Sequence, residues 1–222
     1  MPTVYLIRHA QGSFGSEDYD VLSERGREQV AALADGLRAR GAGSPARVVS
    51  GSLRRQRDTA AALGLRVAVD PRWNEYHDRE ILVHHGEVPA GLEHHAGDPP
   101  LSSREFQSIL NGALGGWIDA GRDGPCSETW PAFRARALDA LDEVAESLGS
   151  GETALVVSSG GVIGAVTAAL MGLPDHALIA FNHVSINTGV TKLAVGRSGI
   201  TVISVNEHGH LERGGGSLVT YR

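Results

Sequence analysis

The stretch Val4-Tyr5-Leu6-Ile7-Arg8-His9-Ala10-Gln11 decides the fold, because a short apolar run ends abruptly in an arginine and a histidine. An apolar run of this length, rich in β-branched and aromatic residues, predicts a buried strand over residues 3–8. Such a strand delivers Arg8 and His9 to the end of a sheet, where ligands bind in open α/β proteins. A neutral imidazole can attack phosphorus, and a guanidinium can hold phosphoryl oxygens in its planar fork. A structural or solvated histidine is the alternative interpretation.

The composition is that of an ordinary globular chain. Its 222 residues, 41% hydrophobic and 21% charged, suffice for one domain with a sizeable core. The formal net charge of −6 argues against a nucleic-acid partner, which would need a basic face. A local cluster of arginines can still bind a small phosphorylated molecule. No stretch approaches the length of a membrane span. The absence of a signal pattern and the single cysteine, Cys126, favour a cytoplasmic location.

Predicted strands and helices alternate along the chain. Strands are expected at 3–8, 46–50, 66–69, 153–157, 184–195 and 200–205, and helices at 24–40, 52–63, 104–119, 131–148 and 160–171. This alternation predicts an α/β fold, a three-layer α/β/α sandwich with a mostly parallel sheet. We expect a single domain over 1–222, with an inserted cap segment at about 76–130 over the active site. The tail after Glu207 is expected to be loose.

Two further polar segments follow predicted strands. Residues 50–59 read Ser-Gly-Ser-Leu-Arg-Arg-Gln-Arg-Asp-Thr, and Arg55 lies near the start of the helix, where free backbone N–H groups suit a phosphate. Residues 156–162 read Val-Val-Ser-Ser-Gly-Gly-Val, whose glycines allow a close backbone approach to an anion. A solvated helix face and plain close packing are the alternatives for these two segments.

Four ordered segments together resemble the histidine phosphatase superfamily, the phosphoglycerate-mutase-like group marked by Arg-His-Gly near the N-terminus. They are Ile7-Arg8-His9-Ala10-Gln11, Leu22-Ser23-Glu24-Arg25-Gly26, Ser50 through Thr59 and Val157 through Gly161. These matches are collinear, so their joint signal is stronger than that of any one segment.

The resemblance implies a role for each matching residue. His9 matches the nucleophile that becomes phosphohistidine, while Arg8 and Arg55 match the two phosphate-binding arginines. Glu75 matches the acid that protonates the leaving oxygen, and Asp78 and Glu80 are rival acids nearby. The implied activity is hydrolysis of a small phosphomonoester, with no metal and no cofactor.

Two positions depart from the family pattern. Ala10 replaces a glycine, which is a small change. Ser159 replaces the second family histidine, so the chain is similar to a branch with serine at that place. A hydroxyl can donate one hydrogen bond but carries no charge. Ser159 and the backbone amide of Gly160 would then help to bind the phosphoryl oxygens.

Other functions remain open from the sequence. One is a mutase, although Gly15 stands where the family has an asparagine useful to such sites, which favours a phosphatase. Another is a catalytically weak module that binds phosphate ligands, which Ser159 favours. Exposed edges after residue 184 leave a homodimer open. A metal hydrolase would need the histidine-rich segment, but its residues lack a His-x-x-x-His pair: His84, His85, Glu87, Glu93, His94, His95 and Asp98.

Overall fold

The structure is a computed structural model that describes residues 1–13, 20–64, 66–86, 103–212 and 218–221. The strands are β1 (Thr3–Arg8), β2 (Arg47–Ser50), β3 (Ala68–Val69), β4 (Thr153–Ser158), β5 (Val190–Gly196) and β6 (Gly199–Glu207). The helices are α1 (Glu24–Ala39), α2 (Arg54–Ala61), α3 (Asp78–His85), α4 (Ser103–Ala120), α5 (Trp130–Glu146), α6 (Gly160–Leu170) and α7 (Ala177–Val184). Short 3-10 turns lie at Pro71–Trp73 and Gly121–Asp123.

Within the described residues, the strands form one six-stranded sheet in the order β3-β2-β4-β1-β5-β6. Strands β3, β2, β4 and β1 run parallel, whereas β5 and β6 are antiparallel additions at one side. Arg8 is paired with Ser158, and Ser50 with Val157, so β1, β4 and β2 end at one edge of the sheet. The predicted α/β fold with a mostly parallel sheet is confirmed.

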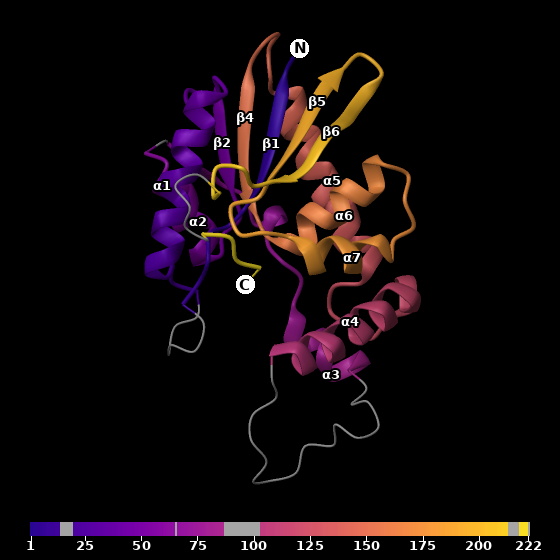
Figure 1. The fold of residues 1–222 in the computed structure, drawn as a ribbon. Helices are drawn as coiled ribbons and strands as arrows, with labels where there is room; N and C mark the ends of the chain where they lie inside the picture. Colours follow the sequence, from indigo (N-terminus) through magenta and orange to yellow (C-terminus); the bar gives the residue numbers. More distant parts are fainter. Residues whose placement is uncertain (14–19, 65, 87–102, 213–217, 222) are drawn as a thin grey trace. The chain divides into compact units, whose positions relative to one another are not determined.

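Helices cover both faces of this sheet. Helices α1 and α2 lie on one side and α6 on the other (Figure 1). Tyr5 and Ile7 of β1 are buried in one cluster with Leu33 and Leu37 of α1. Val4 and Leu6 alternate with them, point to the opposite face and are fully buried. Strand β1 is therefore covered on both faces, which explains its continuous apolar sequence.

Helix α1 forms as the sequence predicts. The Ser23 hydroxyl accepts a hydrogen bond from Gly26 N at 3.0 Å, which caps the first turn. Val30 and Leu33 are buried at helical spacing. Gly41 follows the helix with a φ of 76°, a conformation that favours glycine and ends the helix.

Two helices were not predicted, α3 and α7. In α3 the contiguous Ile81-Leu82-Val83 run gives no helical period, and the helix is only 8 residues long. The α7 sequence, Ala-Leu-Ile-Ala-Phe-Asn-His-Val, contains residues that favour strands. Packing of α7 against α6 overrides that preference. The two helices approach so closely that a methyl group on Gly164 of α6 would lie 3.1 Å from Phe181 Cβ. The strand predicted from 184 accordingly begins only at Val190.

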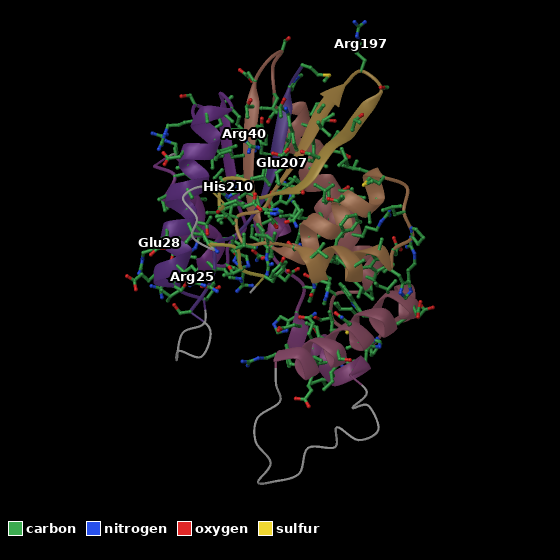
Figure 2. All side chains as sticks on the ribbon, viewed as in Figure 1. Arg25, Glu28, Arg40, Arg197, Glu207 and His210 are labelled. Carbon is green, nitrogen blue, oxygen red and sulfur yellow. The ribbon has the colours of Figure 1, made fainter. Side chains whose placement is uncertain are left out.

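The expectation of a loose tail after Glu207 is wrong for the described residues. His210 and Leu211 are buried, and His210, labelled in Figure 2, packs against α1, because a methyl group on Gly36 would lie 2.9 Å from His210 Cβ. Its Nε2 is 3.0 Å from Thr188 Oγ1. Residues 218–221 also make hydrogen bonds, described with the site below, while Gly214-Gly215-Gly216 lie outside the described residues. The described residues of this tail form no helix or strand, and hydrogen bonds to distant segments hold them in place instead.

The chain divides into two compact units, Met1–Glu75 with Arg136–Arg222, and Tyr76–Ala135. The second unit has its own core of aromatic rings, in which Trp117 lies 5.5 Å from Trp130 and 5.4 Å from Phe133 between ring centroids. That the second unit lies over the active site stays a prediction. Among the residues that the structure describes, no helix has the length and apolar character needed to span a membrane.

We expect Leu6→Ala to lower the free energy of unfolding by about 2–5 kcal/mol, because it opens a cavity in a fully buried strand. Val83→Ala serves as the control, because Val83 is 80% exposed on α3 and its truncation should cost less than about 0.5 kcal/mol. Urea denaturation of both variants checks the difference. Equal losses would show that the core does not lie between these layers.

Candidate active site

His9 follows β1 directly and is 5% exposed. Its Nδ1 lies 2.8 Å from the Ala10 carbonyl oxygen, which can only accept a hydrogen bond, so Nδ1 carries the proton. Its Nε2 receives a hydrogen bond from Arg55 Nε at 3.2 Å, which requires a lone pair on Nε2. The partners on both sides therefore define a neutral imidazole whose Nε2 carries the lone pair.

The surroundings of His9 keep this imidazole neutral. Burial lowers the pKa of His9 well below its usual value of 6.5, and the positive charges of Arg55 and Arg8 lower it further. The hydrogen bond to Ala10 acts in the opposite direction without outweighing them. The free base, which is the form able to attack phosphorus, is thus the stable form at neutral pH.

We expect the stabilising effect of His9 to diminish as the pH falls below about 6.5. The folded pKa is lowered, so in acid the unfolded chain binds a proton at His9 that the folded chain does not bind. The slope for this proton is at most about 1.4 kcal/mol per pH unit. Denaturation of wild type and of His9→Gln between about pH 7.5 and 5 measures it as a change in their difference. A difference independent of pH would contradict the lowered pKa.

Arg55 lies in the first turn of α2 and is oriented by Asp20. Its Nη1 is 2.6 Å from Asp20 Oδ1, while Asp20 Oδ2 accepts a hydrogen bond from Arg54 N at 2.6 Å. Asp20 thus caps α2 from a distant part of the chain and leaves Arg55 Nε directed at His9. The side chains of Arg54 and Arg57 are exposed, so the solvated-face interpretation holds for them.

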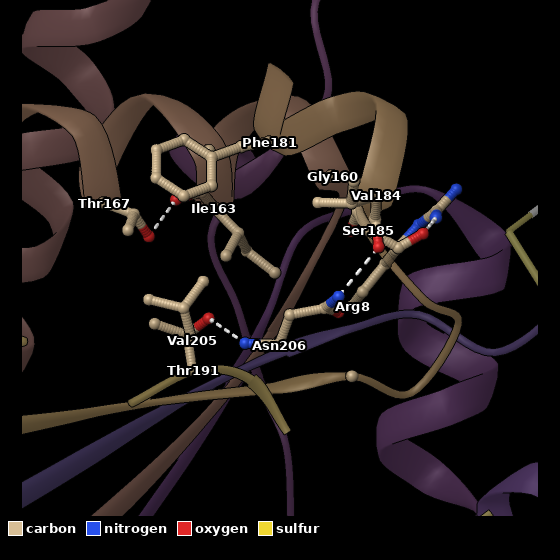
Figure 3. A pocket seen from close by; sticks show the side chains of 12 residues that line it. Arg8, Gly160, Ile163, Thr167, Phe181, Val184, Ser185, Thr191, Val205 and Asn206 are labelled. Atoms are coloured by element: carbon tan, nitrogen blue, oxygen red, sulfur yellow. Dashed lines mark hydrogen bonds between the residues drawn. The ribbon is translucent and has the colours of Figure 1, made fainter. Parts of the chain in front are cut away.

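Arg8 ends β1, and its guanidinium lies against backbone carbonyls. Its Nη1 donates to the carbonyl oxygen of Ser185 and, at 2.9 Å, to that of Tyr221. Figure 3 shows Arg8 beside Ser185 at a small cavity of about 20 Å³. The cavity is lined by the apolar side chains of Ile163, Phe181, Val184 and Val205 and by the polar side chains of Thr167, Thr191 and Asn206. A cavity of this size has room for about one water molecule.

The segment 185–189 between α7 and β5 carries a second support of the site. Asn187 is fully buried and donates from Nδ2 to the His9 carbonyl oxygen at 3.1 Å. Its backbone N donates to the Thr220 carbonyl oxygen at 2.9 Å, and its Oδ1 accepts from Thr220 Oγ1 at 2.9 Å. The tail 218–221 is therefore linked through Asn187 to the backbone of His9.

Asn206 on β6 holds this segment from the edge of the sheet. Its Oδ1 accepts a hydrogen bond from Ile186 N at 2.9 Å, and its Nδ2 donates to the Val184 carbonyl oxygen at 2.7 Å. Its φ of 54° lies in the left-handed region, which asparagine tolerates better than most residues. A methyl group on Gly189 would lie 2.4 Å from Asn206 Oδ1, so this contact requires glycine at position 189.

Ser159 and Gly160 stand at the start of α6, immediately after β4. The Ser159 hydroxyl does not cap the helix but accepts a hydrogen bond from Gln56 Nε2 at 2.8 Å. A methyl group on Gly160 would lie 2.8 Å from Asn182 Oδ1, so the backbone here approaches its neighbour as only glycine can. The α6 N-terminus thus presents backbone N–H groups beside the end of β1.

Glu75 is brought to the same helix start. Its Oε2 accepts a hydrogen bond from Gly161 N at 3.0 Å. The chain before it is anchored at Trp73, whose carbonyl oxygen accepts from Gln56 Nε2 at 3.1 Å and from Ser158 Oγ at 2.7 Å. Both anchoring side chains are buried, so the approach of Glu75 to α6 is well defined.

The alternative candidates for the general acid, Glu80 and Asp78, both belong to the second unit. Glu80 belongs to the second unit, where hydrogen bonds from Ser127 N and Ser127 Oγ, both 2.7 Å, lower the pKa of its carboxyl. Asp78 is exposed.

The candidate metal ligands are only partly described by the structure. His84 and His85 lie on helix α3, whereas His94, His95, Glu87, Glu93 and Asp98 lie outside the described residues. No cluster of potential metal ligands occurs in the part of the chain that the structure describes.

Three supporting residues are missed by sequence reasoning: Asp20, Gln56 and Asn187. Gln56 lies inside the motif around Arg55, but nothing local indicates a bond to Ser159, which is 103 positions away. Asp20 has the residue type of a helix cap, yet it caps a helix that begins 34 positions later. Only Asp20 therefore carries a usable signal, and that signal is weak.

Comparison with known proteins finds a matching family. The profile of the histidine phosphatase superfamily (branch 1) matches residues 4–81 and 104–208. A glucosyl-3-phosphoglycerate phosphatase from Mycolicibacterium vanbaalenii is 34% identical over 189 residues, covering 76% of this chain and 74% of its own.

Solved structures show the same relation. The native structure of a mycobacterial glucosyl-3-phosphoglycerate phosphatase has a TM-score of 0.64 and 26% identity, covering 92% of this chain and 98% of its own. A complex of that mycobacterial phosphatase with inorganic phosphate has a TM-score of 0.64 and 27% identity, covering 94% and 98%. YhfR of Bacillus stearothermophilus, at 23% identity and a TM-score of 0.67 over 96% of this chain and all of its own, shares the fold. This chain belongs to the histidine phosphatase superfamily and is a phosphatase of that family.

Proposed function

We propose that the chain hydrolyses a small phosphomonoester through a phosphohistidine on His9. The observation that carries this proposal is the neutral imidazole, whose Nε2 lone pair faces Arg55 at 3.2 Å while Nδ1 is held by Ala10. In the first step Nε2 attacks phosphorus, the bond to the ester oxygen breaks, and Glu75 gives that oxygen a proton. Water then attacks the phosphohistidine, Glu75 takes its proton, and Nε2 regains its lone pair.

The phosphoryl oxygens would be bound by Arg8, Arg55, Ser159 and the backbone N–H of Gly160. When phosphate enters, Arg55 Nε must exchange its bond with His9 for a phosphoryl oxygen, which frees the lone pair at that moment. The chain thus represents a branch with serine in place of the second histidine. One neutral donor replaces a charged one there, so the two arginines carry most of the anionic charge.

The substrate class we propose is a small phosphorylated sugar or glycerate, in keeping with the named activity of the relatives. The second unit, Tyr76–Ala135, would lie over the site and select among such substrates, because loops and insertions on a rigid scaffold carry recognition.

Release of inorganic phosphate from a panel of phosphomonoesters, including glucosyl-3-phosphoglycerate, tests the substrate class. Acid-quenched enzyme should not retain label, whereas alkaline quenching should preserve a labelled phosphohistidine. Added chelator should leave the rate unchanged. Transfer of phosphate to a second substrate alcohol instead of to water would replace the phosphatase with a mutase.

We also propose that the chain acts in the cytoplasm as a homodimer. Strand β6 is the edge of the sheet and exposes Ile203, a feature that favours pairing with a second copy. Sedimentation analysis tests the dimer, and a monomer at micromolar concentration would contradict it.

A further inference from the structure

We propose that Gln56 is a positioning residue that turns the Ser159 hydroxyl proton toward the bound phosphoryl group. The inference rests on the proposed function and explains how one hydroxyl serves where the family has a histidine. Gln56 is fully buried and Ser159 is 1% exposed, so neither residue exchanges its partner for water readily. Their hydrogen bond, 2.8 Å from Gln56 Nε2 to Ser159 Oγ, joins α2 to the start of α6.

The orientation of the Gln56 amide follows from its two backbone partners. The Trp73 carbonyl oxygen, 3.1 Å away, can only accept, so the amide nitrogen faces it. The Leu53 backbone N–H, 3.3 Å away, can only donate, so the amide oxygen faces it. The group that faces Ser159 is therefore a donor, and Ser159 Oγ must be the acceptor.

This fixed direction leaves the Ser159 proton to be donated elsewhere. The hydroxyl does not cap α6, and the hydrogen bond that it makes within the described ranges is the one it accepts from Gln56 Nε2. Ser159 follows Ser158, whose carbonyl oxygen accepts the His9 backbone N–H at 2.8 Å, so Ser159 directly follows the strand end that is paired with the chain at His9. A phosphoryl oxygen at His9 supplies the acceptor that the buried hydroxyl needs. A hydroxyl that accepts one hydrogen bond also becomes a stronger donor in the next.

A double-mutant cycle with inorganic phosphate as the probe tests this chain of hydrogen bonds from Gln56 through Ser159 to phosphate, called the relay below. Gln56→Glu keeps an oxygen for Leu53 N–H but replaces the donor that faces Ser159 with an acceptor, so the Ser159 proton is drawn toward residue 56. We expect Gln56→Glu and Ser159→Ala each to raise the Kd for phosphate about tenfold and to lower kcat/KM by about tenfold or more. The double variant should lose little beyond either single variant.

Two further variants keep the measurement decisive. Gln56→Met removes the donor without adding charge, and it should behave like Gln56→Glu if the donor is what matters. Thr167→Val, which removes a buried hydroxyl bonded to the Ile163 carbonyl oxygen of the same helix α6, should change the Kd for phosphate by less than about twofold. Thermal unfolding shows that each variant is folded before its binding is compared.

The outcomes separate this inference from the function on which it rests. Losses that multiply in the double variant would overturn the relay, because Gln56 would then act without Ser159. An unchanged phosphate Kd in Ser159→Ala would also overturn it, whatever the Gln56 variants do. If the Gln56 and Ser159 variants lose phosphate binding in a coupled way but the wild type hydrolyses no phosphomonoester, the relay is supported and the proposed function is wrong.

Discussion

The His9→Ala variant should lose at least about 10³-fold of kcat, because it lacks the atom that accepts the phosphoryl group. Arg8 and Arg55 remain in this variant, so we expect KM for the same substrate to change far less than kcat. Steady-state release of phosphate and trapping of the phosphoenzyme measure the two parts separately. The variant should yield no labelled protein at any time after mixing.

The matched control for this loss is His183→Ala, because His183 is an exposed histidine on α7. Its removal should leave both kcat and the labelled intermediate as in the wild type. A His9→Ala protein that still forms a labelled phosphohistidine would assign the nucleophile to another imidazole, and the mechanism above would be wrong.

The Glu75→Gln variant should lose about 10²–10⁴-fold of kcat toward an alkyl phosphomonoester. The amide keeps an oxygen for the Gly161 N–H bond but cannot give a proton to the leaving alkoxide. An aryl ester such as p-nitrophenyl phosphate leaves as a stable anion, so its first step should be affected much less. The ratio of the two rates therefore reports proton donation separately from folding and binding.

Asp78→Asn provides the matched control, since Asp78 is an exposed acid that follows Glu75 closely in the sequence. Its rates on both esters should match the wild type. If Asp78→Asn instead produces the selective loss on the alkyl ester, the general acid is Asp78 and not Glu75.

The strand ends were the most predictable part of this protein. A buried apolar run that stops in polar residues gives both the strand and the edge at which its side chains gather, as at Arg8 and Ser158. Parallel crossovers then bring β1, β2 and β4 to one edge whatever their separation in sequence.

The elements and contacts that the sequence does not predict share a physical cause, which is their dependence on distant parts of the chain. Helices α3 and α7 are 8 residues each and depend on packing against neighbours, so their sequences show little helical period. The roles of Gln56 and Asp20 depend on single side chains that meet across 103 and 35 positions. Local periodicity contains no information about such pairs.

The contact that Asn206 makes with the Ser185-containing segment has a consequence for how the enzyme fails on warming. Edge strands fray before central ones, because they have neighbours on one side only, and this holds for β6 in a chain that is not paired with a second copy. Fraying of β6 would withdraw Asn206 from Val184 and Ile186, and we expect this to loosen Ser185 between them, whose carbonyl oxygen holds Arg8, while β1 and β4 are still paired. We therefore expect heating to abolish activity in molecules whose central sheet is still native.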